Sequence, residues 1–234
     1  MAVRAGSADG PVCGPKVAMV ADRVRDERGG RVVFVSHCLL NENVRYLGGA
    51  TRPGAVGGLV QRYIAEGVGL CQMPCPEQQA WGGVLKPRML RLYGAPALRH
   101  RLVRAGLSVA TRAWMHAVYG RVARRVVADI ADYVHSGMEV VEIVGVAASP
   151  SCGVTTTLNL SRALRAMAQC DPATIDRATV NHDVVASSVE DGSGVFTAAL
   201  RRQLRRRNLR IRFVEHDLLT ELGMVDPETP VAVR

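Results

Sequence analysis

Residues 31–37 (RVVFVSH) decide the fold, because they place four apolar residues in an unbroken run. A short, continuous and largely β-branched run of this kind is typical of a strand that is buried on both faces. Three further runs of similar character occupy residues 68–73, 139–147 and 209–215. Because their apolar residues are nearly continuous, the four runs predict a parallel sheet with both faces covered.

Helical periodicity fills the intervals between these strands. The predicted helices lie near residues 55–66, 97–135, 159–169 and 195–206, and Gly120 divides or bends the longest of them. Residues 78–96 hold so many Gly and Pro that we predict a long loop there. The order strand–helix–strand–helix–strand–helix–helix–strand predicts an α/β fold. We expect a single three-layer domain with a mostly parallel, Rossmann- or flavodoxin-like sheet and helices on both faces.

The two ends of the chain differ in composition from this central part. Residues 1–30 are rich in Gly, Pro, Ala and charge, so we expect a mobile N-terminal extension, with any helix lying around residues 16–25. The α/β domain is predicted to span residues 31–225, and residues 226–234 form a tail.

The overall composition indicates a folded, cytoplasmic protein. Of the 234 residues 48% are hydrophobic and 22% are charged, which excludes a largely disordered chain. No apolar run reaches the ~18 residues of a membrane-spanning helix, and the first residues lack the apolar stretch of a secretory signal. We expect no membrane partner, and a monomer or a homodimer.

The net charge of +9 is concentrated in two arginine-rich segments. Residues 99–125 and 201–212 each contain seven arginines and no acidic residue. These segments are either solvated helix faces or surfaces that steer an anionic ligand or contact nucleic acid. Aromatic residues make up only 4% of the chain, so platforms for stacking bases are scarce. A nucleic-acid partner is therefore possible but not favoured.

Three of the six cysteines occupy equivalent places in the predicted fold. Cys38, Cys75 and Cys152 each follow a predicted strand, and the chain has no Cys-x-x-Cys pair. Because the carboxyl ends of parallel strands meet at one edge of a sheet, these cysteines are expected to converge there. Three converging thiolates suit zinc or an iron–sulfur cluster. The alternative is three separate buried thiols that pack as small apolar residues.

Four motifs make the sequence recognisable. They are SHCLLNENVRY (36–46), PCPE with GGVLKPR (74–77 and 82–88), SPSCG (149–153) and DGSGVFTAAL (191–200). In this order, over roughly residues 31–200, they resemble the 2-thiouracil desulfurase family. Asn-Glu-Asn stands after CLL where the family usually has Gly, which points to a divergent branch. The resemblance implies an α/β domain that holds a 4Fe–4S cluster on Cys38, Cys75 and Cys152. It also implies that the fourth iron has no protein ligand, so that this iron can take sulfur from a thiocarbonyl substrate.

The expected activity is a desulfurase (desulfidase) that converts C=S to C=O in a small thiolated, thionucleobase-like compound. Glu77 is the predicted general acid–base, and its alternative role is a loop carboxylate paired with Arg45 or Arg88. Lys86 and Arg88 either meet an anionic group or form a basic loop. Ser36 and Ser151 are predicted to be catalytic, unless they are turn or cap residues. The predicted substrate-binding residues are Asn41, Arg45, Trp81 and Ser149; for Trp81 the alternative is that it pins a loop to the core.

The same residues are compatible with two other functions. A thiolate-bound zinc hydrolase uses the same cysteines, and an iron–sulfur sensor or RNA-binding module would use the arginine-rich helices. Cys71 is expected to be a buried strand thiol. If it instead bound the fourth iron, no iron of the cluster would be left open to a substrate. For His37 the alternatives are a residue that adjusts the properties of the cluster, a residue that transfers a proton, and a residue without a functional role. Cys13 and Cys170 are not placed for the cluster.

Overall fold

The computed structural model describes residues 15–24 and 26–218. It contains a four-stranded sheet in the order β2-β1-β3-β6, and every neighbouring pair in it is parallel. The strands are β1 (Arg31–Ser36), β2 (Gly69–Met73), β3 (Glu139–Val146) and β6 (Arg212–His216). The predicted α/β fold with a parallel sheet is confirmed.

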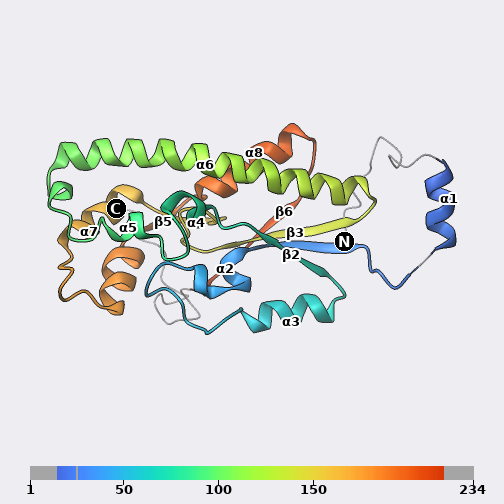
Figure 1. Ribbon diagram of the computed structural model, residues 1–234, viewed down its shortest axis with the longest axis horizontal. Coiled ribbons are helices and arrows are strands. Elements are labelled where there is room, and N and C mark those ends of the chain that lie inside the picture. Colours follow the sequence, from blue (N-terminus) through green and yellow to red (C-terminus); the bar gives the residue numbers. More distant parts are fainter. Residues whose placement is uncertain (1–14, 25, 219–234) are drawn as a thin grey trace.

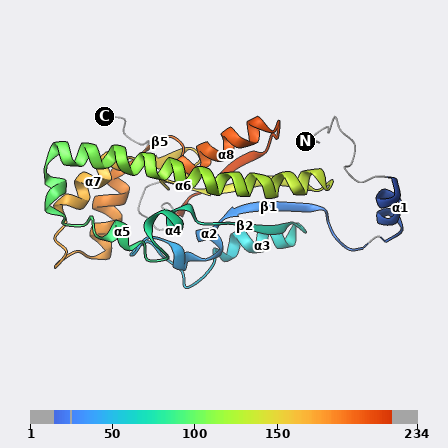
Figure 2. The same cartoon turned by 45° about the horizontal axis from the view of Figure 1, so that its top comes forward.

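Helices cover both faces of this sheet (Figure 1). Helix α3 (Gly57–Ala65) lies on one face, and α6 (Arg101–His135) and α8 (Val195–Arg206) lie side by side on the other, as Figure 2 also shows. Right-handed crossovers explain the arrangement. The chain moves outward from β1 to β2 and then returns across β1 to β3, so the two connecting helices fall on opposite faces.

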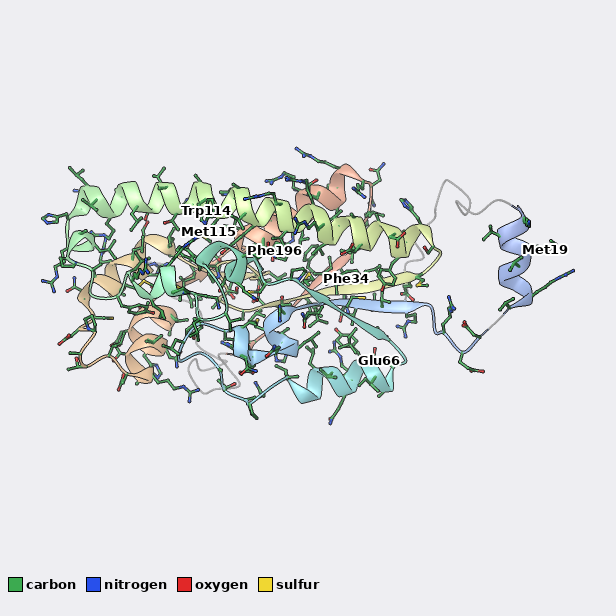
Figure 3. The ribbon with its side chains drawn as sticks, viewed as in Figure 1. Met19, Phe34, Glu66, Trp114, Met115 and Phe196 are labelled. Atoms are coloured by element: carbon green, nitrogen blue, oxygen red, sulfur yellow. The ribbon has the colours of Figure 1, made fainter. Side chains whose placement is uncertain are left out.

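The strand β1 shows how the two layers of the core are separated. Val33 and Val35 belong to the apolar cluster under α3, whereas Val32 and Phe34 belong to the cluster under α6 and α8. This alternation follows from the two-residue period of a strand. Figure 3 shows Phe34 together with Met115 of α6 and Phe196 of α8, which are members of the same cluster.

Helix α6 continues through Gly120, which was expected to divide or bend it. Its central apolar residues pack against the sheet and α8, and this packing offsets the low helix propensity of one glycine. The first turns of α6 extend beyond the sheet and contact α7 (Leu160–Gln169) and the 3₁₀ turn η2 (Pro96–Arg99). No helix in the described ranges is long and apolar enough to cross a bilayer.

The prediction of a long loop over residues 78–96 was wrong. The segment holds most of α4 (Pro76–Trp81), all of α5 (Pro87–Leu90) and the start of η2. Each of these short elements has proline in its first turn, where the missing N–H costs nothing. Gly82 ends α4 in the left-handed conformation, with φ of 89°. The prolines and glycines therefore mark helix ends here and not an irregular loop.

A second group of elements lies beyond the carboxyl ends of the strands (Figure 1). Its antiparallel pair is β4 (Thr156–Leu158) and β5 (Val189–Asp191). Between them the chain forms α7, a π-helical segment η3 (Thr179–Val185) and the turn η4 (Ala186–Ser188). Together with η2 they enclose a separate apolar cluster. The chain thus places an additional cover at the sheet edge where the cysteines were expected.

The N-terminal helix α1 (Pro15–Arg23) lies apart from the sheet in Figures 1 and 2, and its Met19 is exposed. It matches the helix expected around residues 16–25. Residues 1–14, 25 and 219–234 lie outside the described residues, as do Cys13 and the predicted tail 226–234.

Candidate active site

The three strand-end cysteines line one cavity of about 120 Å³. Cys38 lies in the short helix α2 (His37–Leu40) directly after β1, and Cys75 is the N-cap residue of α4 just after β2. Cys152 lies in the loop after β3. The structure therefore brings together, at the carboxyl edge of the sheet, side chains that are 37 and 77 residues apart in sequence.

Burial strongly affects these thiols. It raises the pKa of Cys38 to about 12, and the positive charge of Arg45 only partly opposes this. Burial also raises the pKa values of Cys75 and Cys152, and the neighbouring Cys38 and Cys75 thiols raise that of Cys152 further. Without a metal the three groups are thus neutral thiols at neutral pH. A bound metal centre displaces such protons and stabilises the thiolates.

The three cysteines supply the cavity with soft donors. Within residues 15–24 and 26–218, no group of three or more His, Cys, Asp or Glu side chains is gathered closely enough to hold a single metal ion. In an iron–sulfur cluster each cysteine binds a different iron, so its ligands are spread around the cluster. Cys38, Cys75 and Cys152 line one cavity, and soft thiolates of this kind are the usual ligands of an iron–sulfur cluster.

Glu77 places a carboxylate in the same cavity. It lies in the first turn of α4, two residues after Cys75. The Ser151 hydroxyl donates to its Oε1 at 2.8 Å, and the Lys86 ammonium lies 3.5 Å from its Oε2. Lys86 is only 1% exposed and also donates to the carbonyl of Val44. A carboxylate that faces the cavity between a hydroxyl donor and a buried ammonium is well placed to move protons.

The partner of Glu77 differs from both expected partners. The sequence suggested Arg45 or Arg88, but the ion pair is formed by Lys86. Arg88 instead donates to the carbonyl oxygen of Ala80 at 3.2 Å. Lys86 adopts the left-handed conformation, with φ of 51°, at the start of α5, and this backbone turn directs its side chain inward.

Two of the three predicted serines lie at the cavity. Ser149 and Ser151 line it, and the Ser149 hydroxyl accepts a hydrogen bond from the Cys152 amide at 3.0 Å. The Ser151 hydroxyl lies 3.5 Å from the Cys152 sulfur. Ser36 is outside the cavity lining, and its buried hydroxyl donates to the carbonyl of Val144 at 2.9 Å. It also forms a hydrogen bond with the Cys152 thiol, which lowers the pKa of Cys152 against the effect of burial. Ser36 thus joins β1 to β3 beneath the site.

The SPSCG and DGSG motifs pack against each other. At the start of α8 the amides of Phe196 and Thr197 donate to the Ser151 carbonyl at 3.0 and 3.1 Å. A methyl group at Gly194 would lie 2.3 Å from that carbonyl oxygen, so only glycine allows this approach. The helix N-terminus therefore holds the loop that carries Cys152.

Adding a methyl group at Gly194 is expected to displace the Cys152 loop. We expect Gly194→Ala to lower the free energy of unfolding by about 1–3 kcal/mol because of overpacking. For a domain of this size the melting temperature should fall by roughly 2–12 °C, measured by circular dichroism. The matched control is Gly58→Ala, since a methyl group there meets no atom within 4 Å and lies in helix α3. An unchanged melting temperature in Gly194→Ala would contradict this packing.

Glu215 holds the other side of the same loop, and the sequence analysis missed it. From β6 its carboxylate accepts hydrogen bonds from the amides of Val154 and Thr155 and from the hydroxyls of Thr155 and Thr156. No motif around Glu215 marks this role. Only the parallel pairing of β6 with β3 brings it to the loop.

Of the remaining predicted residues, some line the cavity and others lie outside it. Arg45 lines the cavity, as does His37, whose Nδ1 is buried without a hydrogen-bond partner among the described residues. Asn41 does not line it, since its side chain accepts from the Asn43 amide and caps a 3₁₀ turn. Trp81 also lies outside the lining and packs against the core cluster under α6. The alternative of a tryptophan that pins its loop to the core describes Trp81 better than a stacking platform.

The other two described cysteines are not part of the lining. Cys71 packs against the α6-side core, and its thiol interacts with Tyr133. Cys170 is buried in the apolar cluster of the cover. Neither arginine-rich segment contributes a residue to the cavity either, since their arginines lie on and beside α6 and α8.

Glu42 lies in the 3₁₀ turn (Glu42–Val44) that follows α2, close to Cys38 in the chain. It is fully buried and accepts hydrogen bonds from the Thr51 amide at 2.6 Å and from Arg52 at 3.0 Å. Burial alone would raise its pKa, but these hydrogen bonds outweigh burial, so the pKa of Glu42 is lowered. Glu42 thus ties the loop from residue 42 to residue 54 to the end of β1.

This lowered pKa predicts a pH-dependent stability. The contribution of Glu42 is fully present above the unfolded pKa of about 4.3 and is lost as the pH falls from there through the folded pKa. Glu42→Gln should lower the free energy of unfolding at pH 7 by about 1–3 kcal/mol. The difference from the unmodified protein should shrink below pH ~4 in urea titrations. A constant difference from pH 7 to pH 3 would show that the charge of Glu42 has no such role.

The cover supplies the opposite, apolar wall of the cavity. The apolar lining side chains from this side are Met89, Tyr93, Leu158, Met167, Val184 and Val185. The cavity is thus lined by thiols and the Glu77 carboxylate from the strand ends and α4, and by apolar side chains from the side of the cover.

Comparison with known proteins gives one match. A family model described as 2-thiouracil desulfurase matches residues 33–208, which is well over half of the chain. No curated protein and no solved structure matches.

Proposed function

The chain belongs to the 2-thiouracil desulfurase family, and we propose that it uses a 4Fe–4S cluster to remove sulfur from a small thiolated compound. The observation that carries this proposal is the common cavity of Cys38, Cys75, Cys152 and Glu77. It combines a soft ligand set with a proton-transferring group. The family name supports the desulfurase activity, and the thiol-rich cavity supports the cluster.

Cys38, Cys75 and Cys152 are the residues that would hold the cluster. When bound on three cysteines, such a cluster supplies an iron with an open position that acts as a Lewis acid toward soft sulfur. The protein contributes the surroundings of the cluster. Ser149 fixes the Cys152 backbone, and the Arg45 charge favours the Cys38 thiolate.

Glu77 is the proposed proton carrier. The overall reaction, C=S + H₂O → C=O + H₂S, involves no oxidation or reduction. It breaks the carbon–sulfur bond, forms a carbon–oxygen bond and moves two protons from water to sulfur. The Glu77 carboxylate can accept a proton from the attacking water and return it to the leaving sulfur. Ser151 and Lys86 hold this carboxylate at the cavity wall by the 2.8 Å and 3.5 Å contacts described above.

The apolar wall accounts for the substrate class. A flat thio-heterocycle of thionucleobase type would lie against Met89, Tyr93 and Val184, with its sulfur toward the cysteines. Burial of the ring there removes apolar surface from water and excludes bulk water from the reacting bond.

The test is turnover by protein that has been loaded anaerobically with iron and sulfide. It is incubated with a panel of thio-heterocycles that includes 2-thiouracil and 4-thiouracil, and released sulfide and the oxo product are both measured. We expect equal amounts of the two from at least one compound, and none with metal-free protein. If no compound is desulfurated, or if zinc-loaded protein is the active form, the proposal fails.

A further inference from the structure

The two arginine-rich segments of the sequence meet on one face of the folded protein. Helices α6 and α8 pack side by side on the same face of the sheet, and α8 lies beside the second half of α6 (Figures 1 and 2). The outer sides of both helices therefore point away from the sheet in the same direction. Six exposed arginines, three from each helix, form the arginine patch: Arg121, Arg124, Arg125, Arg202, Arg205 and Arg206.

The arginine patch concentrates positive charge in a small area. Each triplet spans about 6 Å of its helix, and packed helices lie roughly 8–10 Å apart. The first acidic residue after the α6 triplet is Asp129, one turn beyond Arg125. Within the described part of the chain, none of the six arginines forms an ion pair or a side-chain hydrogen bond. Their charge is therefore not compensated by the protein itself.

The stability of the helices does not account for this arrangement. Arg121 and Arg125 are like charges at positions i and i+4, as are Arg202 and Arg206, and such pairs destabilise a helix. The helix dipole favours the arginines in the last turn of α8, but it does not act on the α6 triplet, which lies well inside its helix. An anionic partner would offset the repulsion in both helices.

The residues around the arginines select among anionic partners. Apart from the patch, only Ala117 and Ala128 are exposed between residues 117 and 128 of α6, and no other residue of α8 is exposed. A bilayer surface takes up large apolar side chains, a protein interface has an apolar or aromatic core, and single-stranded nucleic acid stacks on aromatic rings. None of these groups is exposed in this part of the two helices. The phosphate backbone of a duplex requires only the guanidinium groups.

We propose that the arginine patch is a docking surface for the phosphate backbone of double-stranded nucleic acid. A duplex carries one negative charge per about 1.7 Å of its axis, so it can face all six arginines within the dimensions of the patch. Because the patch offers contacts to phosphates alone, binding is expected to be independent of base sequence. RNA and DNA duplexes share this chemistry, and the experiment below distinguishes them. The patch lies outside the cavity lining, so this inference goes beyond the proposed function and does not depend on the metal centre.

Fluorescence anisotropy with short labelled duplexes of RNA and of DNA tests the proposal on the full-length protein. We expect a Kd of roughly 10⁻⁴–10⁻⁶ M at physiological salt. Six phosphate contacts predict a slope of about −5 when the logarithm of the binding constant is plotted against that of the salt concentration. Changing Arg121, Arg124 and Arg125 together to Gln should weaken binding at least about tenfold and make the slope less steep by about 3.

The matched control changes Arg91, Arg99 and Arg101 together to Gln. These arginines are also exposed, and Arg101 lies roughly 30 Å before Arg121 along α6. The control lowers the net charge by the same amount but leaves the patch intact, so it should bind as the unmodified protein does. The Gln variant of the patch should keep its melting temperature or raise it, since like-charge repulsion is removed. A variant with Lys at the same three positions retains the charge and should keep the salt dependence.

Each result bears directly on the proposal. A preference for the RNA or the DNA duplex that disappears in the Gln variant of the patch would support it and identify the partner. A Kd weaker than ~10⁻⁴ M for both duplexes, an equal loss in the control, or an unchanged slope in the Gln variant of the patch would overturn it. Tighter binding of the single strand, or binding of phosphatidylglycerol vesicles but not of a duplex, would also overturn it. So would a folded Lys variant that has lost the salt dependence.

Discussion

Glu77→Gln is expected to lower turnover by at least about 100-fold while the protein keeps its fold and its iron. The amide has nearly the size of the carboxylate and can still accept a hydrogen bond from Ser151, but it cannot accept a proton from water. The variant therefore removes the proposed proton carrier and preserves the shape of the cavity. The rate of sulfide release per iron-loaded chain is the quantity to measure.

The matched control for this variant is Glu66→Gln. Glu66, labelled in Figure 3, is the C-cap residue of α3. Among the described residues its exposed carboxylate has a single ion-pair contact, of 4.0 Å, with Arg62. Full turnover in Glu77→Gln would identify Glu77 as a residue that pins α4 to Lys86 and Ser151. Loss of iron in this variant would instead make Glu77 a support for Cys75. Either result would contradict its role as the proton carrier.

Changing Cys38, Cys75 or Cys152 to serine is expected to abolish iron loading or reduce it severely. A serine hydroxyl is a hard donor that does not replace a thiolate toward iron in a cluster. Iron and acid-labile sulfide per chain, measured after anaerobic loading, report the outcome. Cys170→Ser should load normally, because Cys170 is buried in the apolar cluster of the cover.

Cys71→Ser decides between three and four cysteine ligands. Its thiol lies against the α6-side core and interacts with Tyr133, outside the cavity lining, so we expect normal loading. A loss of the cluster there would favour four-cysteine ligation and a role in electron transfer or sensing. Normal loading of all three cavity variants would contradict the ligand set.

The sheet could be predicted because each strand is marked by a short run of apolar residues that are adjacent in sequence. The runs around Val33 and Val144 are apolar on both faces, as burial between two helical layers requires. The common location of Cys38, Cys75 and Cys152 followed from the same signal, since in a parallel sheet equivalent strand ends meet. Here topology alone was enough to bring distant residues together.

The rest of the site depends on contacts that no local pattern records. Lys86 points inward because its backbone is left-handed, a conformation that a non-glycine residue rarely adopts. Its ion pair with Glu77 also depends on the helix α4, which the sequence analysis took for a loop. Glu215 reaches the Cys152 loop from a strand about 60 residues away. Trp81 packs against the core because α4 packs on α6, and the sequence had left this position open as the alternative to a stacking platform.

The most direct test of the account is the Mössbauer spectrum of ⁵⁷Fe-loaded protein with and without a compound that it desulfurates. Three cysteine ligands predict about four irons per chain, of which one differs from the other three and alone changes when the thio-compound is added. A protein that loads only one or two irons, or four equivalent irons that the compound leaves unchanged, would contradict a cluster held by Cys38, Cys75 and Cys152 with one iron open to the substrate.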